Sequence, residues 1–259
     1  MSRTPARIVC LTEEPTEILY LLGEQDRIVG ISAYTVRPPE AKRDKPVVSA
    51  FVSGSVEKIK ALEPDLVIGY SDVQADLAAQ LIRENLQVLI LQQHTLEEIL
   101  EAILLLGRLV GRDEAARALV SGYRERLDAA RQRTAAAPSR PRVYFEEWPD
   151  PLLCGGGWVS ELVRVAGGED VFADRASQRK AMDRVVTPKE VIDRAPEVML
   201  ASWCGKPFEP DVPRSREGWE TVPAIRDGRV HEIDSAIILQ PGPGALTAGL
   251  DALEAILRA

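Results

Sequence analysis

Apolar residues in the first part of the chain fall into short continuous runs that alternate with amphipathic segments. The runs predict strands at residues 7–11, 27–31, 66–70 and 88–91. The amphipathic segments predict helices at residues 15–22, 56–62 and 76–84. Strands that are apolar on both faces are typical of a parallel sheet covered by helices on each side. The pattern therefore predicts an α/β unit with a parallel sheet.

A long helical periodicity begins at Thr95, which forms a capping-box sequence with Glu98. The periodicity is interrupted at residues 107–111 and then continues to about Arg133. Charged residues line one face of the second helical segment, and solvent exposure with i,i+4 pairing explains them. The small residues and prolines of 134–141 end this helix and form the predicted linker.

The alternation of strands and helices then resumes. Strands are predicted at residues 142–145, 197–201 and 229–233, and helices at 159–166, 187–194 and 244–258. The chain is therefore expected to form two Rossmann-like α/β lobes with parallel sheets, joined by a long interlobe helix. The expected boundaries are an N-terminal lobe at 1–112, an interlobe helix and linker at 113–138, and a C-terminal lobe at 139–259.

Length and charge limit the classes of partner. A chain of 259 residues is long enough for two domains of ordinary size. The net charge of −8 argues against binding to nucleic acid and gives no reason to sit on an anionic membrane. No apolar stretch is long enough to span a membrane, and the first residues do not resemble a secretory signal. As the sequence stands, we expect a cytoplasmic monomer, or a periplasmic one if a leader has been removed.

The residues that could carry catalysis are few. Cys10, Cys154 and Cys204 are widely spaced, without a CxxC pair or a metal-ligand cluster, and cannot all pair within the chain. Cys10 lies in an apolar run and is expected in the core. No nucleophile–base pair or phosphate-binding loop is found in the sequence. We predict no catalytic residue and no metal site, and an α/β enzyme using Glu146, Glu147 or Cys154 is the alternative.

Aromatic residues mark the predicted binding site in the second half of the chain, which holds all the tryptophans. These are Trp148, Trp158, Trp203 and Trp219. Trp148 and Trp203 directly follow predicted strands, where open α/β sheets place their binding crevice. Their flat rings would suit the wall of a site for a ring system. Packing in the second core is the alternative for both, and the helical setting of Trp158 favours packing.

Further ligand candidates follow the strands of the first half. Tyr34 and Tyr70 each come at the end of a predicted strand, and Phe51 lies in a loop. His94 follows the strand at 88–91 and could ligate a metal-centred macrocycle, or form a loop hydrogen bond instead.

Two adjacent carboxylates, Glu146 and Glu147, stand at the end of the strand before Trp148. Neighbours in a strand point to opposite faces, so at most one should reach a ligand. Such a glutamate would accept a hydrogen bond from a polar edge of the ligand, and a structural salt bridge is the alternative.

Several stretches, in this order, resemble the cobalamin and ferric-siderophore binding proteins of bacterial ABC uptake systems. The stretches are RIVCLTEEPTEILYLLG, RIVGISAY with RPPEA, VEKIKALEPDLVIG, GGWVSELVRVAGGEDVF and VIDRAPEVML. The resemblance covers nearly the whole chain, and the segment from Tyr34 to Pro39 is most similar to the cobalamin binders. It implies a non-enzymatic protein whose lobes close on a corrinoid-like small molecule such as cobalamin, with no permanently bound cofactor.

The resemblance also implies contacts with a membrane permease. Transport members of this family present one surface glutamate on each lobe to arginines of the permease. Glu57 fits the first position, seven residues before Pro64. At the same distance before Pro196 stands Lys189, with Glu190 one position later. The lysine favours the alternative of a cytoplasmic carrier or sensor without a permease, which binds a metal chelate or another aromatic ligand.

Overall fold

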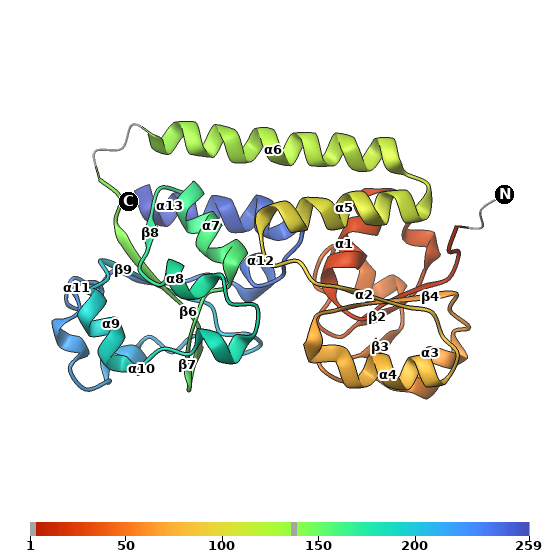
Figure 1. The fold of residues 1–259 in the computed structure, drawn as a ribbon, viewed down its shortest axis with the longest axis horizontal. Coiled ribbons are helices and arrows are strands. Elements are labelled where there is room, and N and C mark those ends of the chain that lie inside the picture. Colours follow the sequence, from red (N-terminus) through yellow and green to blue (C-terminus); the bar gives the residue numbers. More distant parts are fainter. Residues whose placement is uncertain (1–3, 136–138, 259) are drawn as a thin grey trace. The chain divides into compact units, whose positions relative to one another are not determined.

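The computed structural model describes residues 4–135 and 139–258, so residues 136–138 of the predicted linker lie outside the described part. The chain divides into two compact units (Figure 1). The N-terminal unit comprises residues 1–93 and 97–122, and the C-terminal unit comprises residues 94–96 and 123–259. The long helix α6 (Asp113–Ala135) contributes residues to both units.

The N-terminal unit is built on a parallel sheet. Its strands are β1 (Ile8–Cys10), β2 (Ile28–Ser32), β3 (Val47–Ser49), β4 (Leu66–Tyr70) and β5 (Val88–Leu91), in the order β3-β2-β1-β4-β5. The chain runs from β1 through β2 to the edge strand β3, and then returns to pair β4 with the other side of β1. The order therefore reverses between β1 and β4. In open α/β sheets, ligands bind at the carboxyl ends of the strands at such a switch point.

Helices cover this sheet. They are α1 (Glu13–Leu21), α2 (Ala41–Asp44), α3 (Val56–Ala61), α4 (Ala75–Arg83) and α5 (Leu96–Val110). Ser55 caps α3, because its hydroxyl accepts a hydrogen bond from the Lys58 amide. Buried residues of β1 and β4, including Val9 and Val67, pack with Ile59 of α3. The alternation predicted for this part of the chain is confirmed, although the short strand β3 and the short helix α2 were not predicted.

The C-terminal unit has a mixed sheet. Its strands are β6 (Arg142–Pro149), β7 (Leu152–Cys154), β8 (Glu169–Asp170), β9 (Val198–Ala201) and β10 (Val230–Glu232). The order is β10-β9-β6-β7, and β8 also pairs with β6. The β7 strand is antiparallel to β6, whereas the other pairings are parallel. The expected parallel pairing is confirmed for β6, β8, β9 and β10, and β7 departs from it, because a short hairpin joins it to β6 and a parallel crossover needs a much longer connection.

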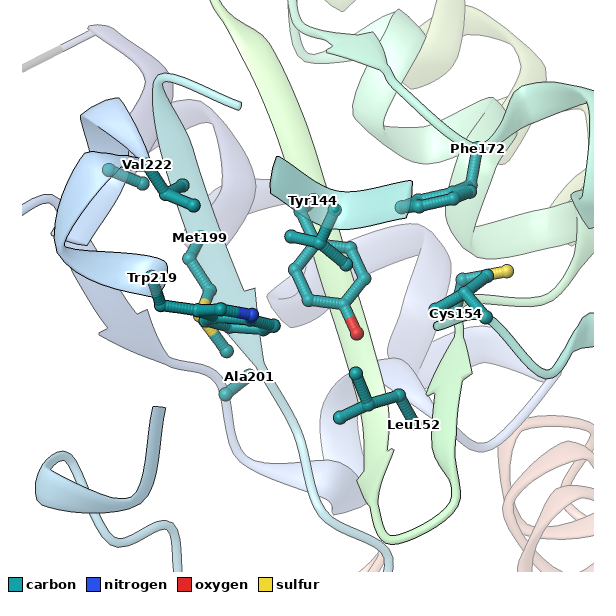
Figure 2. Packing of buried hydrophobic residues seen from close by; sticks show 11 residues of the cluster. Tyr144, Leu152, Cys154, Phe172, Met199, Ala201, Trp219 and Val222 are labelled. Carbon is teal, nitrogen blue, oxygen red and sulfur yellow. The ribbon is translucent and has the colours of Figure 1, made fainter. Parts of the chain in front are cut away.

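The helices of this unit surround a core rich in aromatic residues. They are α7 (Gly157–Val165), α8 (Ala173–Ala176), α9 (Pro188–Arg194), α10 (Asp211–Arg214), α11 (Pro223–Arg226), α12 (Ser235–Ile238) and α13 (Leu250–Arg258). Figure 2 shows Tyr144 of β6 between Phe172 and Trp219. Both neighbouring rings meet Tyr144 edge to face, at centroid distances of 5.5 Å and 6.1 Å. This packing fixes the strands whose carboxyl ends carry the candidate site.

Among the described residues, no helix has the length and apolar character needed to cross a membrane.

Candidate ligand-binding site

One buried glutamine joins the strand ends of the N-terminal unit. The Gln74 amide nitrogen donates to the carbonyl oxygens of Leu11 at 3.3 Å and Phe51 at 2.7 Å. Its amide oxygen accepts from the backbone nitrogen of Tyr70 at 2.9 Å. These bonds connect the ends of β1 and β4 with the loop after β3. Sequence reasoning missed Gln74, although its place in the polar loop that follows a predicted strand was the signal that could have found it.

The aromatic candidates of the N-terminal unit divide into two groups. Tyr34 is 45% exposed, and its ring meets Phe51 edge to face with a centroid distance of 6.3 Å. Tyr70 is buried, and its hydroxyl donates to the carbonyl oxygen of Gln93 at 3.0 Å. The structure therefore brings Tyr34 and Phe51 together at the strand ends, whereas Tyr70 packs inside the unit.

A buried acidic cluster begins α1, directly after β1. Thr12, Glu13 and Glu14 are all nearly inaccessible to solvent. One Glu13 oxygen accepts from the Val36 amide at 2.6 Å. The other Glu13 oxygen has no hydrogen-bond partner among the described residues, and the Glu14 carboxyl lies within hydrogen-bonding reach of the Thr12 side chain. Burial raises the pKa of Glu13 to about 8 and raises the pKa of Glu14 as well.

A third glutamate lies beside these two. Glu17 accepts from Arg37 through Nε at 2.9 Å and through a terminal nitrogen at 2.6 Å. Sequence reasoning did not select any of the three glutamates, because acidic residues in the first turn of a helix are ordinarily explained by the helix dipole. The signal that could have found them is the dense run of polar residues immediately after a strand.

Two tryptophans lie at the strand ends of the C-terminal unit in different environments. Trp148 is half-buried at the end of β6, and the Lys206 ammonium lies 4.5 Å from its ring centroid. Trp203 follows β9 and is only 5% exposed. Trp203 and Lys206 line a cavity of about 360 Å³ together with residues 232–235 at the end of β10. Of the two tryptophans, Trp203 therefore lines the cavity, whereas Trp148 lies against Lys206 from the lining.

The carboxylate of Glu146 is fully buried and is held in an ion pair. Both terminal nitrogens of Arg216 donate to it, at 2.6 Å and 3.0 Å. The indole nitrogen of Trp203 and the hydroxyl of Tyr144 also donate to it, at 3.1 Å and 3.2 Å. Of the two roles left open for Glu146, the structural salt bridge is the one that the structure shows, because its oxygens already receive four donors.

Glu147 and Cys154, the other two residues that the sequence offered for catalysis, are also bound by neighbouring groups. Glu147 pairs with Arg184 at 2.7 Å, with both side chains largely buried. The Cys154 thiol donates to the Arg184 carbonyl oxygen at 3.3 Å, and burial raises the pKa of this thiol to about 12. A thiol of such a pKa is not a nucleophile at neutral pH. Glu146, Glu147 and Cys154 are therefore all engaged by other groups of the C-terminal unit.

His94 belongs to the C-terminal unit, although it follows β5 of the N-terminal unit in the sequence. Together with Thr95 it lines a cavity of about 520 Å³ in the C-terminal unit, formed by α7, β8 and α8. Its carbonyl oxygen would lie 2.3 Å from a β-carbon at Gly157, so only glycine fits at that position. Within residues 4–135 and 139–258, no group of three or more histidine, cysteine or acidic side chains is placed to hold a metal ion.

The two predicted permease contacts differ in availability. Glu57 is exposed on α3 and bonds only locally, to the Ser55 hydroxyl at 3.2 Å. Glu190 accepts from the Thr187 amide in the capping box of α9, and also from Arg175 at 2.8 Å. Lys189 is exposed and pairs with Asp193. The Glu57 carboxylate is therefore accessible to a partner, whereas the Glu190 carboxylate is already bound to Thr187 and Arg175.

Two α/β units with aromatic rings at their strand ends are typical of proteins that bind small molecules. A family model described as periplasmic binding protein matches residues 8–237. The chain belongs to this family.

Relatives of known sequence or structure extend the comparison. An uncharacterized ABC transporter substrate-binding lipoprotein, YvrC of Bacillus subtilis, is 25% identical over 94% of this chain and 77% of its own length. A vitamin B12-binding protein of Vibrio parahaemolyticus is 27% identical over 96% of this chain and 88% of its own length. The periplasmic heme-binding protein RhuT of Roseiflexus sp. RS-1, in its apo form, superposes with a TM-score of 0.81 at 26% identity, covering 97% of this chain and 98% of RhuT. The chain is thus similar to substrate-binding proteins of ABC uptake systems.

Proposed function

We propose that the protein binds a corrinoid of the cobalamin type and serves an ABC uptake system. The observation that carries the proposal is the pair of aromatic surfaces at the strand ends. Tyr34 and Phe51 form one in the N-terminal unit, and Trp148 and Trp203 form the other in the C-terminal unit. Flat rings of this kind stack on a macrocycle and add roughly 0.5–1.5 kcal/mol beyond the burial of area.

The similarity to proteins named for vitamin B12 and for heme supports a tetrapyrrole-type ligand. Both kinds of ligand are wide, flat rings with a central metal, so aromatic walls would suit either. A cytoplasmic carrier or sensor for such a metal chelate stays the second candidate, because Glu190 is engaged in its own helix cap.

Titration with cobinamide should show binding of one molecule per chain, with a visible spectrum that follows the protein during gel filtration. Trp148→Ala should weaken this binding about tenfold and leave the melting temperature nearly unchanged, because the ring is half-buried and packs against an exposed lysine. Calorimetry and thermal melts of both proteins provide the measurement. A titration with no heat and no retained colour would contradict the proposal.

We further propose that Glu57 is the permease contact of the N-terminal unit. In the native host, replacing the chromosomal gene by one encoding Glu57→Lys should reduce corrinoid uptake severalfold while binding to the purified protein is unchanged. Glu114→Lys, which also reverses an exposed acidic residue in the first turn of a helix, is the matched control. Uptake that is insensitive to Glu57→Lys and to deletion of the gene would favour the carrier without a permease.

A further inference from the structure

We infer that the open edge of the N-terminal sheet, at β5, binds an extended, basic segment of another protein by strand addition. The inference concerns a sheet edge rather than the ligand site, and it goes beyond the proposed function.

The strand β5 forms one edge of the N-terminal sheet, and among the described residues it pairs only with β4. The carbonyl oxygens of Gln87 and Leu91 accept backbone hydrogen bonds from the β4 side, at 2.9 Å and 2.8 Å. Successive residues of a strand turn their backbone groups alternately to its two sides. Val88 and Ile90 therefore turn their N–H and C=O groups toward the open edge.

This edge lacks the features that ordinarily protect a sheet. Charged residues, prolines or bulges usually stand at an edge, because its unpaired backbone groups can bind another strand. The edge strand β3 pairs irregularly with β2, and the edge strand β10 carries His231 and Glu232. By contrast, β5 has no charged residue and pairs with β4 in regular register. The side chains of residues 88–90 are also partly exposed.

A groove beside the edge offers room for the side chains of an added strand. This edge groove has a volume of about 560 Å³ and is lined by residues 89–93 and by α5. Its apolar lining includes Leu89, Ile90 and Leu105, and Leu105 is 39% exposed. In strand addition, backbone hydrogen bonds supply affinity, and pockets for alternate side chains supply specificity. The edge and the groove together provide both elements.

The charge of the edge groove indicates the kind of partner. Glu97, Glu98 and Glu101 of α5 line it together with Arg108, and Glu101 is exposed. The resulting negative charge attracts a basic segment and disfavours an acidic one. A second copy of this chain would bring the same glutamates to the contact, so like charges would meet. A basic segment of a different protein is therefore the occupant that fits.

Short labelled peptides test the inference on the whole protein. One peptide alternates lysine and valine, and its counterpart alternates glutamate and valine. Fluorescence anisotropy should show that the lysine peptide binds at least about tenfold more tightly, with an affinity that falls as salt is added. A version of the lysine peptide with methylated backbone nitrogens cannot donate to the edge. It should bind at least about tenfold more weakly than the unmethylated peptide.

Two variants locate the binding at β5. Glu101→Lys should weaken binding of the lysine peptide about fivefold. Glu114→Lys makes the same charge change at an exposed position of α6 outside the edge groove, and should leave binding unchanged. Ile90→Pro removes an outward N–H but none of the bonds between β5 and β4, so binding should weaken at least about tenfold.

Thermal melts of each variant show whether the fold is kept, and the methylated peptide and Glu101→Lys carry the test if Ile90→Pro does not fold. Equal binding of the lysine and glutamate peptides would overturn the inference. So would binding that neither methylation nor the β5 and α5 substitutions weaken. A dimer of the wild type that Ile90→Pro abolishes, detected by sedimentation velocity, would assign the edge to a second copy and also overturn the inference. Each of these results would leave the proposed ligand binding intact.

Discussion

Replacing Arg216 by methionine should lower the free energy of unfolding by roughly 3–5 kcal/mol. The substitution removes the cation that neutralises Glu146, whose carboxylate is fully buried in the C-terminal unit. A charge left without its partner in such a place keeps its desolvation cost and loses the compensating attraction. The variant also loses the contact of the guanidinium with the Trp219 ring, 4.4 Å away. Urea unfolding followed by tryptophan fluorescence measures the effect.

A second substitution should restore much of this loss. Glu146→Gln in the Arg216→Met background removes the charge but keeps an oxygen that can accept from the Trp203 indole, which lies 3.1 Å from the carboxylate. Arg214→Met is the matched control, because its pairing with Asp211 is long, at 3.6 Å, and exposed. The control should change stability by less than about 1 kcal/mol. A similarly small effect for Arg216→Met would show that Glu146 does not depend on this ion pair.

The strand positions of the N-terminal unit followed directly from the sequence. The bounds predicted for β4 and β5 agree with the structure, because each is a run of apolar residues with polar or proline residues on both sides. The strands β3, β7 and β8 were missed. Each has only two or three residues, and such short strands form through pairing with a neighbour rather than through a pattern of their own.

The positions of candidate residues at strand ends could also be predicted, whereas their partners could not. Trp203 follows β9 as predicted, whereas Trp148 lies within β6, because this strand continues to Pro149, beyond the predicted end at residue 145. The pairing of Glu146 with Arg216 joins residues that are 70 positions apart, and no local pattern specifies such a contact. The acidic residues of α1 were overlooked for a different reason. Charged residues are rarely fully buried unless they are paired, so nothing in the sequence indicates that Glu13 and Glu14 are buried.

The stability of the protein should fall as the pH rises from about 4.5 to about 8. Burial raises the pKa of Glu13 from 4.5 to about 8 and also raises that of Glu14. Above pH 4.5 the unfolded chain releases these protons, whereas the folded chain still holds them. The folded state therefore binds more protons in this range, and its stability decreases as the pH increases. The stabilising contribution of these carboxyls is fully present below the pKa that they have in the unfolded chain. It is lost as the pH rises through their pKa in the folded protein.

Glu13 contributes on the order of 1 kcal/mol per pH unit within this range, and Glu14 acts in the same direction. Glu17 and Arg37, the other charges beside Glu13, form an ion pair. Urea unfolding at about pH 5.5 and about pH 7.5 should therefore give the higher stability at the lower pH. Glu13→Gln should reduce this difference, because glutamine does not titrate, while Glu114→Gln should not. A wild-type stability that is constant or rises over the same range would mean that these carboxyls are ionised in the folded protein.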